Sequence, residues 1–350
     1  MSKLTLDSVE WKEFRIEEIF EIKKVRGKAI DKLEVGETPY ISTSAINNGL
    51  INFVKSDESN ISSKNCISID PIGGKAFYHG YDFVGRGFSG ASINTLYNER
   101  INEYTGLFIV NCIENTSKFK ASYGYLFKSN RLARGVIQLP VAEENEPNWQ
   151  FMEDYIKQER KKQAIQIRNY YEPKMLKLAG ELAGLEEVEW KEFWLEDVCE
   201  IQSGIRLTQS DMTEGDRPFI GATEFNNGIT AFVSNTNKSL DSNVLGVNYN
   251  GSVVKNFYHE YECVFSDDVK RLKVKDNAYQ NKYVYLFLKQ VILQQERKYA
   301  YGYKFNASRM KRQKIMLPVG QTGEPNYSYM IDQMKWLEFK EMYTLLSAIK

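Results

Sequence analysis

The chain has 350 residues, and its 46 basic and 46 acidic side chains give a formal net charge of zero. This length suits two domains, and 42% hydrophobic residues with 13% aromatics exclude a globally disordered chain. No apolar stretch approaches the ~18 residues of a membrane span, and the sequence begins without an export signal. The four cysteines are scattered and form no CxxC pair, which indicates a reduced, cytoplasmic protein.

The first half of the chain predicts strands followed by a long helix. Over residues 11–140, short runs rich in Val, Ile, Tyr and Phe alternate with Gly, Asn, Ser and Asp clusters, a pattern typical of strands joined by turns. After Pro147, helical spacing of apolar residues extends over roughly 24 residues, a length of about 36 Å. We expect Pro173 to kink or end this helix, with a second helical piece over residues 174–183.

The second half repeats this order of elements. Strand-like runs return over residues 190–318 with a short helix over 283–295, and a C-terminal helix follows over 326–350. The halves share seven segments in the same order, at offsets of 178 to 180 residues. These segments are Val9–Phe14 with Val188–Phe193, Pro39–Ile41 with Pro218–Ile220, Asn47–Gly49 with Asn226–Gly228, Phe77–His79 with Phe257–His259, Tyr123–Tyr125 with Tyr301–Tyr303, Leu139–Val141 with Leu317–Val319, and Glu146–Asn148 with Glu324–Asn326.

The repeat is domain-sized and predicts an α+β fold with two similar domains of mixed, twisted sheets and short helices. We place these domains at residues 1–147 and 188–325, a central helical spacer at 148–187 and a C-terminal spacer helix at 326–350. Each long helix carries an apolar stripe too long for an isolated helix, so we expect the two to pair as an antiparallel spacer. A duplicated domain whose helices pack only on their own sheets is the alternative.

Sequence motifs for catalysis are weak or absent. Gly85–Gly90 matches GxGxxG, yet neither a following helix nor a βαβ unit accompanies it. Asp267 and Asp268 have no acidic counterpart in the first copy, so a turn is favoured over a metal site. His79 and His259 stand between aromatic residues, which is typical of core positions rather than of a catalyst. We therefore expect neither a catalytic residue nor a cofactor in this chain.

Basic and polar residues recur after each Tyr-Gly-Tyr segment. Arg, Lys and Asn side chains can bind phosphates and base edges, whereas a solvated helix face with incidental cations is the alternative. Because the net charge is zero, a DNA-binding surface would have to be a local basic face. The two Asn-Asn-Gly segments predict hairpin turns, and the Ser and Thr residues before them are further polar candidates. The candidate DNA-binding residues are Ser42, Thr43, Ser44, Arg86, Tyr123, Tyr125, Lys128, Arg131, Arg134, Thr223, Asn250, Lys255, Tyr301, Tyr303, Lys304, Asn306, Arg309 and Arg312.

Each copy resembles a target-recognition domain of restriction–modification specificity subunits. The resemblance is carried by Trp190–Val198, Pro218–Ile220, Asn227-Gly228 and Leu317-Pro318, and it covers nearly the whole chain, twice. With only 350 residues and Leu-Pro-Val in place of the usual Leu-Pro-Pro, the chain is most similar to the BcgI-type (type IIB) specificity, or beta, subunit. A short type I specificity subunit is the near neighbour.

The resemblance implies a non-catalytic subunit that reads a bipartite double-stranded DNA site, one half per copy. Arg86 corresponds to Ser266 in the second copy, so the two half-sites should differ. A helix of about 36 Å is close to one turn of B-DNA, ~34–36 Å. The helices would also dock a methyltransferase/endonuclease subunit, which would bind S-adenosylmethionine and Mg²⁺. A duplicated protein-tethering scaffold without DNA binding, and a cryptic nuclease or methyltransferase, are the alternatives.

Overall fold

A computed structural model describes residues 3–87, 92–117, 127–182, 184–185, 187–300 and 302–349. The chain divides into two compact units, Met1–Gln166 and Ile167–Lys350, and the division falls within the long helix α4 (Trp149–Glu181). The predicted Tyr123, Tyr125 and Tyr301 lie outside the described residues. No helix in the described ranges combines the length and apolarity needed to cross a lipid bilayer.

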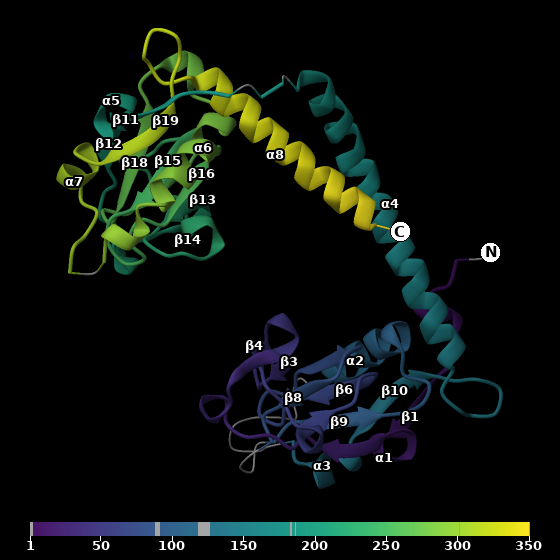
Figure 1. The fold of residues 1–350 in the computed structure, drawn as a ribbon. Coiled ribbons are helices and arrows are strands. Elements are labelled where there is room, and N and C mark those ends of the chain that lie inside the picture. The colour runs from purple at the N-terminus through teal and green to yellow at the C-terminus, as the bar shows by residue number, and fades with distance from the viewer. Residues whose placement is uncertain are drawn as a thin grey trace. The chain divides into compact units, whose positions relative to one another are not determined.

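Each unit combines short strands with a few helices (Figure 1). The first contains β1 (Trp11–Arg15), α1 (Ile16–Ile19), β2 (Glu21–Lys24), β3 (Val35–Ile41), β4 (Leu50–Val54), β5 (Ile61–Ser62), β6 (Cys66–Ile69), β7 (Ala76–His79), β8 (Phe83–Gly85), β9 (Asn94–Tyr97), α2 (Glu103–Ser117), α3 (Ser129–Ala133), β10 (Val136–Pro140) and the start of α4. The second contains the end of α4, then β11 (Trp190–Trp194), α5 (Leu195–Val198), β12 (Cys199–Ser203), β13 (Glu214–Ile220), β14 (Ile229–Val233), β15 (Val244–Asn248), β16 (Asn256–His259), β17 (Val264–Phe265), β18 (Val269–Val274), α6 (Lys282–Leu293), α7 (Ala307–Lys311), β19 (Lys314–Pro318) and α8 (Tyr327–Ala348).

The strands form three sheets per unit, which confirms the predicted α+β class. The first unit has the strand orders β1-β10, β2-β9-β6-β7 and β4-β3-β8-β5. The second has β11-β19, β12-β18-β15-β16 and β14-β13-β17. Pairing is antiparallel throughout except for β3 with β8 and β13 with β17, which are parallel. The sequence repeat holds at the level of register, since Trp11 lies opposite Pro140 and Trp190 lies opposite Pro318.

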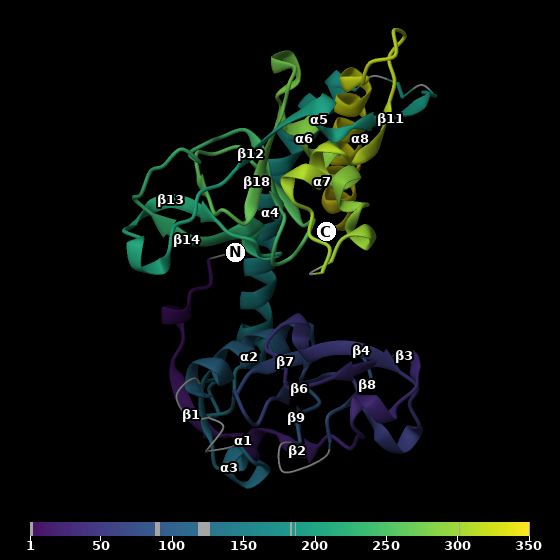
Figure 2. The same cartoon turned by 90° about the vertical axis from the view of Figure 1, so that its left-hand side faces the viewer.

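In each unit, one helix and the sheet that contains β3 or β13 cover the two faces of the sheet that contains β6 or β15. In the first unit, α2 lies against β6 and β7 (Figure 2), and its Ile109 and Ile113 join Ile67 and Leu96 in the main core. On the other face, Cys66 packs with residues of the β3–β8 sheet in a second, smaller core. Complete burial of such side chains contributes about 1.5–3 kcal/mol each, and all four residues of β6 are buried because both of its faces are covered. The helix α6 takes the place of α2 in the second unit.

The helix α4 is longer than the sequence predicted. It runs through Pro173 to Glu181 as one element of 33 residues, about 50 Å along its axis. The expected end at Pro173, and the expected helix length of about 36 Å, are therefore wrong. A proline in a helix removes one backbone donor at a cost of about 3 kcal/mol, and packing of the flanking turns against another helix offsets such a cost.

That packing occurs within the second unit, where the end of α4 runs antiparallel to α8. The Arg168 guanidinium donates to the carbonyl of Ile349 at 3.3 Å, and Lys335 pairs with Glu181 at 2.8 Å. Residue numbers rise along α4 while they fall along α8, as the predicted antiparallel spacer requires. Two matched helices can bury apolar stripes that neither helix buries alone.

Candidate nucleic-acid interface

An exposed stack of aromatic and basic side chains precedes and includes α7 in the second unit. The Arg309 guanidinium carbon lies 3.8 Å from the centroid of the Tyr303 ring, and this ring stacks at 5.6 Å on Tyr299. The Tyr303 side chain is 52% exposed, and Arg309 also donates through Nη1 to the carbonyl of Lys304 at 2.7 Å. Stacking and one hydrogen bond together fix the plane of the guanidinium, and the donors that remain can reach a base edge or a phosphate.

The base of this stack is tied to the protein interior. The Tyr299 hydroxyl donates to Oε1 of Gln313 at 2.7 Å, and Gln313 is only 3% exposed. Nε2 of Gln313 in turn donates to Gln295 at 3.0 Å and to the carbonyl of Lys314. Sequence reasoning missed Tyr299 and Gln313, and the repeat gave no signal for them because Gly135 corresponds to Gln313 in the first copy. The backbone carbonyl of Gln313 accepts from the amide of Leu195, the first residue of α5. The carbonyl of Gly135 accepts in the same way from Ile16, the first residue of α1.

The other predicted residues near α7 have separate roles. The carboxamide oxygen of Asn306 accepts from the backbone amide of Arg309 at 3.0 Å, so Asn306 caps the N-terminus of α7 and positions Arg309. Arg312 is exposed at the C-terminal end of the same helix, and Lys304 is half-buried. Five of the predicted residues therefore lie on this one helix or on the segment that precedes it.

The basic residues of the first unit surround the corresponding helix, α3. Lys128 is exposed at the N-cap, and the Arg131 guanidinium lies 5.4 Å from the ring centroid of Phe127. Arg134 is exposed at the other end of the helix and donates to the carbonyl of Asn130 at 3.2 Å. The structure thus brings the predicted cations of each copy together on an equivalent short helix.

The Ser and Thr candidates lie beside the Asn-Asn-Gly turns and stabilise them. The Ser44 hydroxyl accepts from the backbone amide of Ile46 at 3.3 Å, and Thr223 accepts from that of Phe225 at 3.2 Å. Ser42 bonds through its backbone amide to Gly49, and Arg86 donates to the Thr43 hydroxyl at 3.3 Å. The predicted hairpin turns are confirmed between β3 and β4 and between β13 and β14, with both asparagines of each turn at positive φ.

Two candidates of the second unit have partners inside the protein. Asn250 donates to the Asp268 carboxylate at 2.9 Å, and Lys255 pairs with Glu296 at 3.0 Å. Asp267 and Asp268 occupy a turn before β18, as predicted. In the described part of the chain, no three His, Cys, Asp or Glu side chains are grouped as a metal site would need.

Both histidines are core residues with no exposed surface. His79 Nε2 lies 2.7 Å from the Ser68 hydroxyl, and burial lowers the pKa of His79 to about 4. Burial lowers the pKa of His259 to about 4 as well, but its Nε2 has no partner among the described residues, because Gly246 corresponds to Ser68. Each Nδ1 contacts a tyrosine hydroxyl two residues later. Both rings are therefore neutral packing groups at neutral pH.

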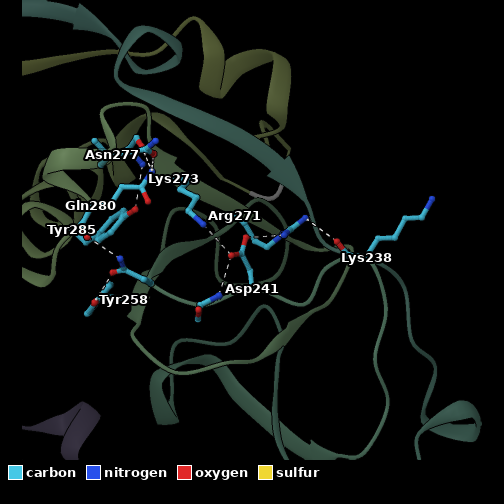
Figure 3. A network of polar contacts seen from close by, with 11 residues as sticks. Lys238, Asp241, Tyr258, Arg271, Lys273, Asn277, Gln280 and Tyr285 are labelled. Atoms are coloured by element: carbon cyan, nitrogen blue, oxygen red, sulfur yellow. Dashed lines mark hydrogen bonds and ion pairs between the residues drawn. The ribbon is translucent and has the colours of Figure 1, made fainter.

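A buried charge network distinguishes the second unit (Figure 3). Arg271 on β18 is 6% exposed, and its Nη1 donates to Asp241 at 2.9 Å while Lys273 approaches the same carboxylate at 3.5 Å. Nη2 of Arg271 donates to the carbonyls of Ser203 and Lys238. Burying a guanidinium requires such pairing, because an unpaired buried charge costs several kcal/mol. These cations serve the fold and do not extend the predicted interface.

Comparison with known proteins agrees with this arrangement. Residues 8–168 and 187–336 each match the family described as type I restriction modification DNA specificity domain. The chain belongs to this family and carries its domain twice. It is 42% identical over 339 residues to the type II restriction enzyme BgcI specificity subunit S.BcgI of Heyndrickxia coagulans, covering 95% of this chain and 96% of that protein.

One solved structure shows the same fold at lower sequence similarity. The type I restriction-modification system S subunit from M. genitalium is 16% identical, with a TM-score of 0.55 over 99% of this chain and 95% of that one. The HsdS subunit from Thermoanaerobacter tengcongensis is 15% identical, with a TM-score of 0.34 over 97% and 90%. The M. genitalium protein confirms the two-copy α+β fold, and the family assignment confirms the resemblance to specificity subunits.

Proposed function

We propose that this chain is the non-catalytic DNA-recognition subunit of a restriction–modification enzyme. The observation that carries the proposal is a scaffold repeated in register, in a specificity-domain family, whose two copies bear different side chains at equivalent positions. Arg86 and Ser266 illustrate this difference, because each bonds through its backbone amide to the end of the neighbouring strand in the same way. One backbone with two sets of side chains suits a bipartite and asymmetric double-stranded DNA site.

The short helices α3 and α7 would supply the main contacts. Their cations lie at the surface on equivalent elements, and an arginine with a fixed plane can donate two hydrogen bonds to guanine or to a phosphate. Arg309 fits this requirement because Tyr303 and the Lys304 carbonyl hold it. Lys128 and Arg134, which are exposed, would reach DNA phosphates in the first unit.

The catalytic chemistry would belong to a methyltransferase/endonuclease subunit that docks on this chain. The paired helices offer a surface for it, since Trp336, Leu337 and Tyr343 of α8 are 40%, 40% and 58% exposed. S-adenosylmethionine and Mg²⁺ would be bound by that subunit. This division of labour also accounts for a zero net charge, because acidic surface can face the partner while a local basic face meets DNA.

Selection of bound duplexes from a random DNA pool tests the proposal. The chain is used first alone and then with host lysate as the source of the catalytic subunit. We expect a two-part sequence motif with a fixed gap, in at least the second condition. Absence of enrichment in both conditions would refute DNA recognition and favour the protein-tethering scaffold.

A further inference from the structure

The first unit has an open groove with a basic wall beside its edge strand β2. The groove has a volume of about 470 Å³, and Lys23, Lys24 and Arg26 line it together with the hydroxyl residues Ser59 and Ser62. None of the described residues that line it is acidic. Three cations and several hydroxyl donors around one hollow form a suitable environment for an anion.

Most of this positive charge is not used by the fold. Lys23 lies 2.9 Å from Glu21, but both side chains are more than half exposed, and such pairs contribute little to stability. Lys24 and Arg26 are exposed and form no ion pair with any described residue. An arrangement of exposed like charges is unfavourable without a counterion, so these residues are better explained by an anionic ligand than by folding.

The second unit provides an internal comparison at the same rungs of its sheet. In the first unit Lys23 lies opposite Thr95 and Lys24 lies opposite Asn94, so the cations are on β2. At the offset of 179, Gln202 and Ser203 replace the two lysines, and Ile205 replaces Arg26.

In the second unit the cations of the equivalent cross-strand pairs are on β18 rather than on β12, and their side chains are buried. Arg271 and Lys270 of β18 are 6% and 8% exposed, and they lie opposite Gln202 and Ser203. Arg271 is neutralised by Asp241 (Figure 3), and Lys270 donates to the Ser203 hydroxyl at 2.9 Å. The same sheet positions therefore hold buried, paired cations in one unit and exposed cations in the other.

The groove is linked to the basic helix α3. Asn94, the cross-strand neighbour of Lys24, donates to the carbonyl of Phe127 at 3.0 Å and accepts from the Ser129 hydroxyl at 2.7 Å. Lys128 stands between these two residues. The groove and α3 thus lie near the same end of the sheet, where α3 contacts β2. We call the groove cations Lys23, Lys24 and Arg26 the basic strip.

We propose that this strip binds DNA backbone phosphates through Lys23, Lys24 and Arg26, and that the second unit has no equivalent contact through β12. The inference rests on the proposed function and adds a division of roles to it. The first unit supplies a large, sequence-independent share of the affinity. The ammonium groups at the ends of flexible, exposed lysine side chains fit phosphate oxygens, which are the same for every base.

The test replaces the groove cations by the residues of the second copy. The full-length Lys23→Gln/Lys24→Ser/Arg26→Ile variant is compared with wild type for binding a cognate and a scrambled duplex between 50 and 200 mM salt. Each phosphate contact contributes about 0.9 to the slope of log affinity against log salt, so three contacts change affinity across this range by about 40-fold. We expect the variant to lose a salt response of this size on both duplexes. The half-site sequences selected from a random pool should stay the same.

A control variant removes three exposed cations of the same unit, two from β1 and one directly after β4, namely Lys12→Gln/Arg15→Gln/Lys55→Gln. Its salt slope should match that of wild type, because it removes the same net charge away from the groove. If the triple variant unfolds, Lys24→Ser/Arg26→Gln should still remove about two-thirds of the effect. An unchanged slope in the groove variants, an equal loss in the control, or a changed half-site sequence would overturn the inference. Wild-type chain that binds no duplex at all, alone or with the catalytic subunit, would instead refute the proposed function.

Discussion

The stack on α7 makes a prediction about how one half-site is read. Arg309 lies over Tyr303, Tyr303 stacks on Tyr299, and the Tyr299 hydroxyl bonds to the buried Gln313. We therefore consider three substitutions: Arg309→Ala removes the reading group, Tyr299→Ala removes the support, and Tyr299→Phe removes only the bond to Gln313. Comparison of the three separates the contact with DNA from the positioning of that contact.

The expected magnitudes follow from these contacts. Loss of a bidentate base contact costs about 1–3 kcal/mol, or roughly 5- to 150-fold in affinity. Tyr299→Ala should cause a smaller loss than Arg309→Ala, because the guanidinium keeps Tyr303 and the Lys304 carbonyl but Tyr303 loses its stacking partner. Tyr299→Phe keeps the ring, so its affinity should be close to wild type while its unfolding free energy falls by about 1 kcal/mol.

The assay is competition binding with duplexes that carry substitutions in either half of the selected site. Arg309→Ala should flatten discrimination at one half and leave the other unchanged, since the stack belongs to a single unit. The control is Lys191→Ala, which removes an exposed cation from β11 of the same unit. Equal losses at both half-sites would show that the units do not read DNA separately. A Tyr299→Ala variant with full discrimination would refute the positioning role.

Three further predictions concern stability. Ser68→Ala leaves Nε2 of the buried His79 without its partner and should lower the unfolding free energy of the first unit by about 1–3 kcal/mol in urea titrations; a neutral result would show that the bond at 2.7 Å contributes nothing. The folded-state pKa of about 4 for His79 and His259 lies below the unfolded value of 6.5, so the unfolded chain binds more protons between these values. The contribution of each histidine to the unfolding free energy is at its maximum above about pH 6.5 and should fall by about 2 kcal/mol between pH 7 and pH 5. Equal unfolding midpoints at pH 7 and pH 5 would contradict the burial of neutral rings. Pro173→Ala restores a backbone donor inside α4 and should raise the melting temperature of the second unit, with a gain of up to about 3 kcal/mol; a lower melting temperature would mean that the helix depends on a bend at this residue.

Much of the fold could be predicted from the sequence because buried apolar residues recur along it in a regular pattern. Short runs rich in Val, Ile, Tyr and Phe between turn clusters predicted the strands, and the repeated segments predicted two similar domains. The matching register of Trp11–Pro140 and Trp190–Pro318 agrees with that repeat. Pro173 was misjudged because local propensity favours an end there, whereas antiparallel packing against α8 favours continuation. Tertiary contacts between residues about 150 positions apart, such as Lys335 with Glu181, produce no recognisable pattern in the sequence.

The sequence predicted which elements carry the clustered cations but not the structural role of each residue. The sequence identified α3 and α7 through their cations, yet it did not separate Arg309, which is held at the surface, from Asn306, which caps the helix. Lys24 and Arg271 are both basic residues on strands, but Lys24 is exposed and Arg271 is buried beside Asp241. The sequence does not separate these environments, because Asp241 lies 30 residues before Arg271 in the chain.

The two units share one cross-strand contact and differ at the next, which would allow one scaffold to serve the two half-sites of the proposed function. Tyr78 donates to Asn65 at 2.8 Å and Tyr258 donates to Asn243 at 2.8 Å, and both asparagines have positive φ. This shared bond fixes the turn before each central strand in the same geometry. On neighbouring rungs the side chains differ in charge and in the direction they face, from exposed lysines on β2 to a buried arginine on β18. Because both units keep the same strand pairing with different side chains at these positions, a change of exposed side chains on one unit would alter what that unit binds while the other unit stays as it was.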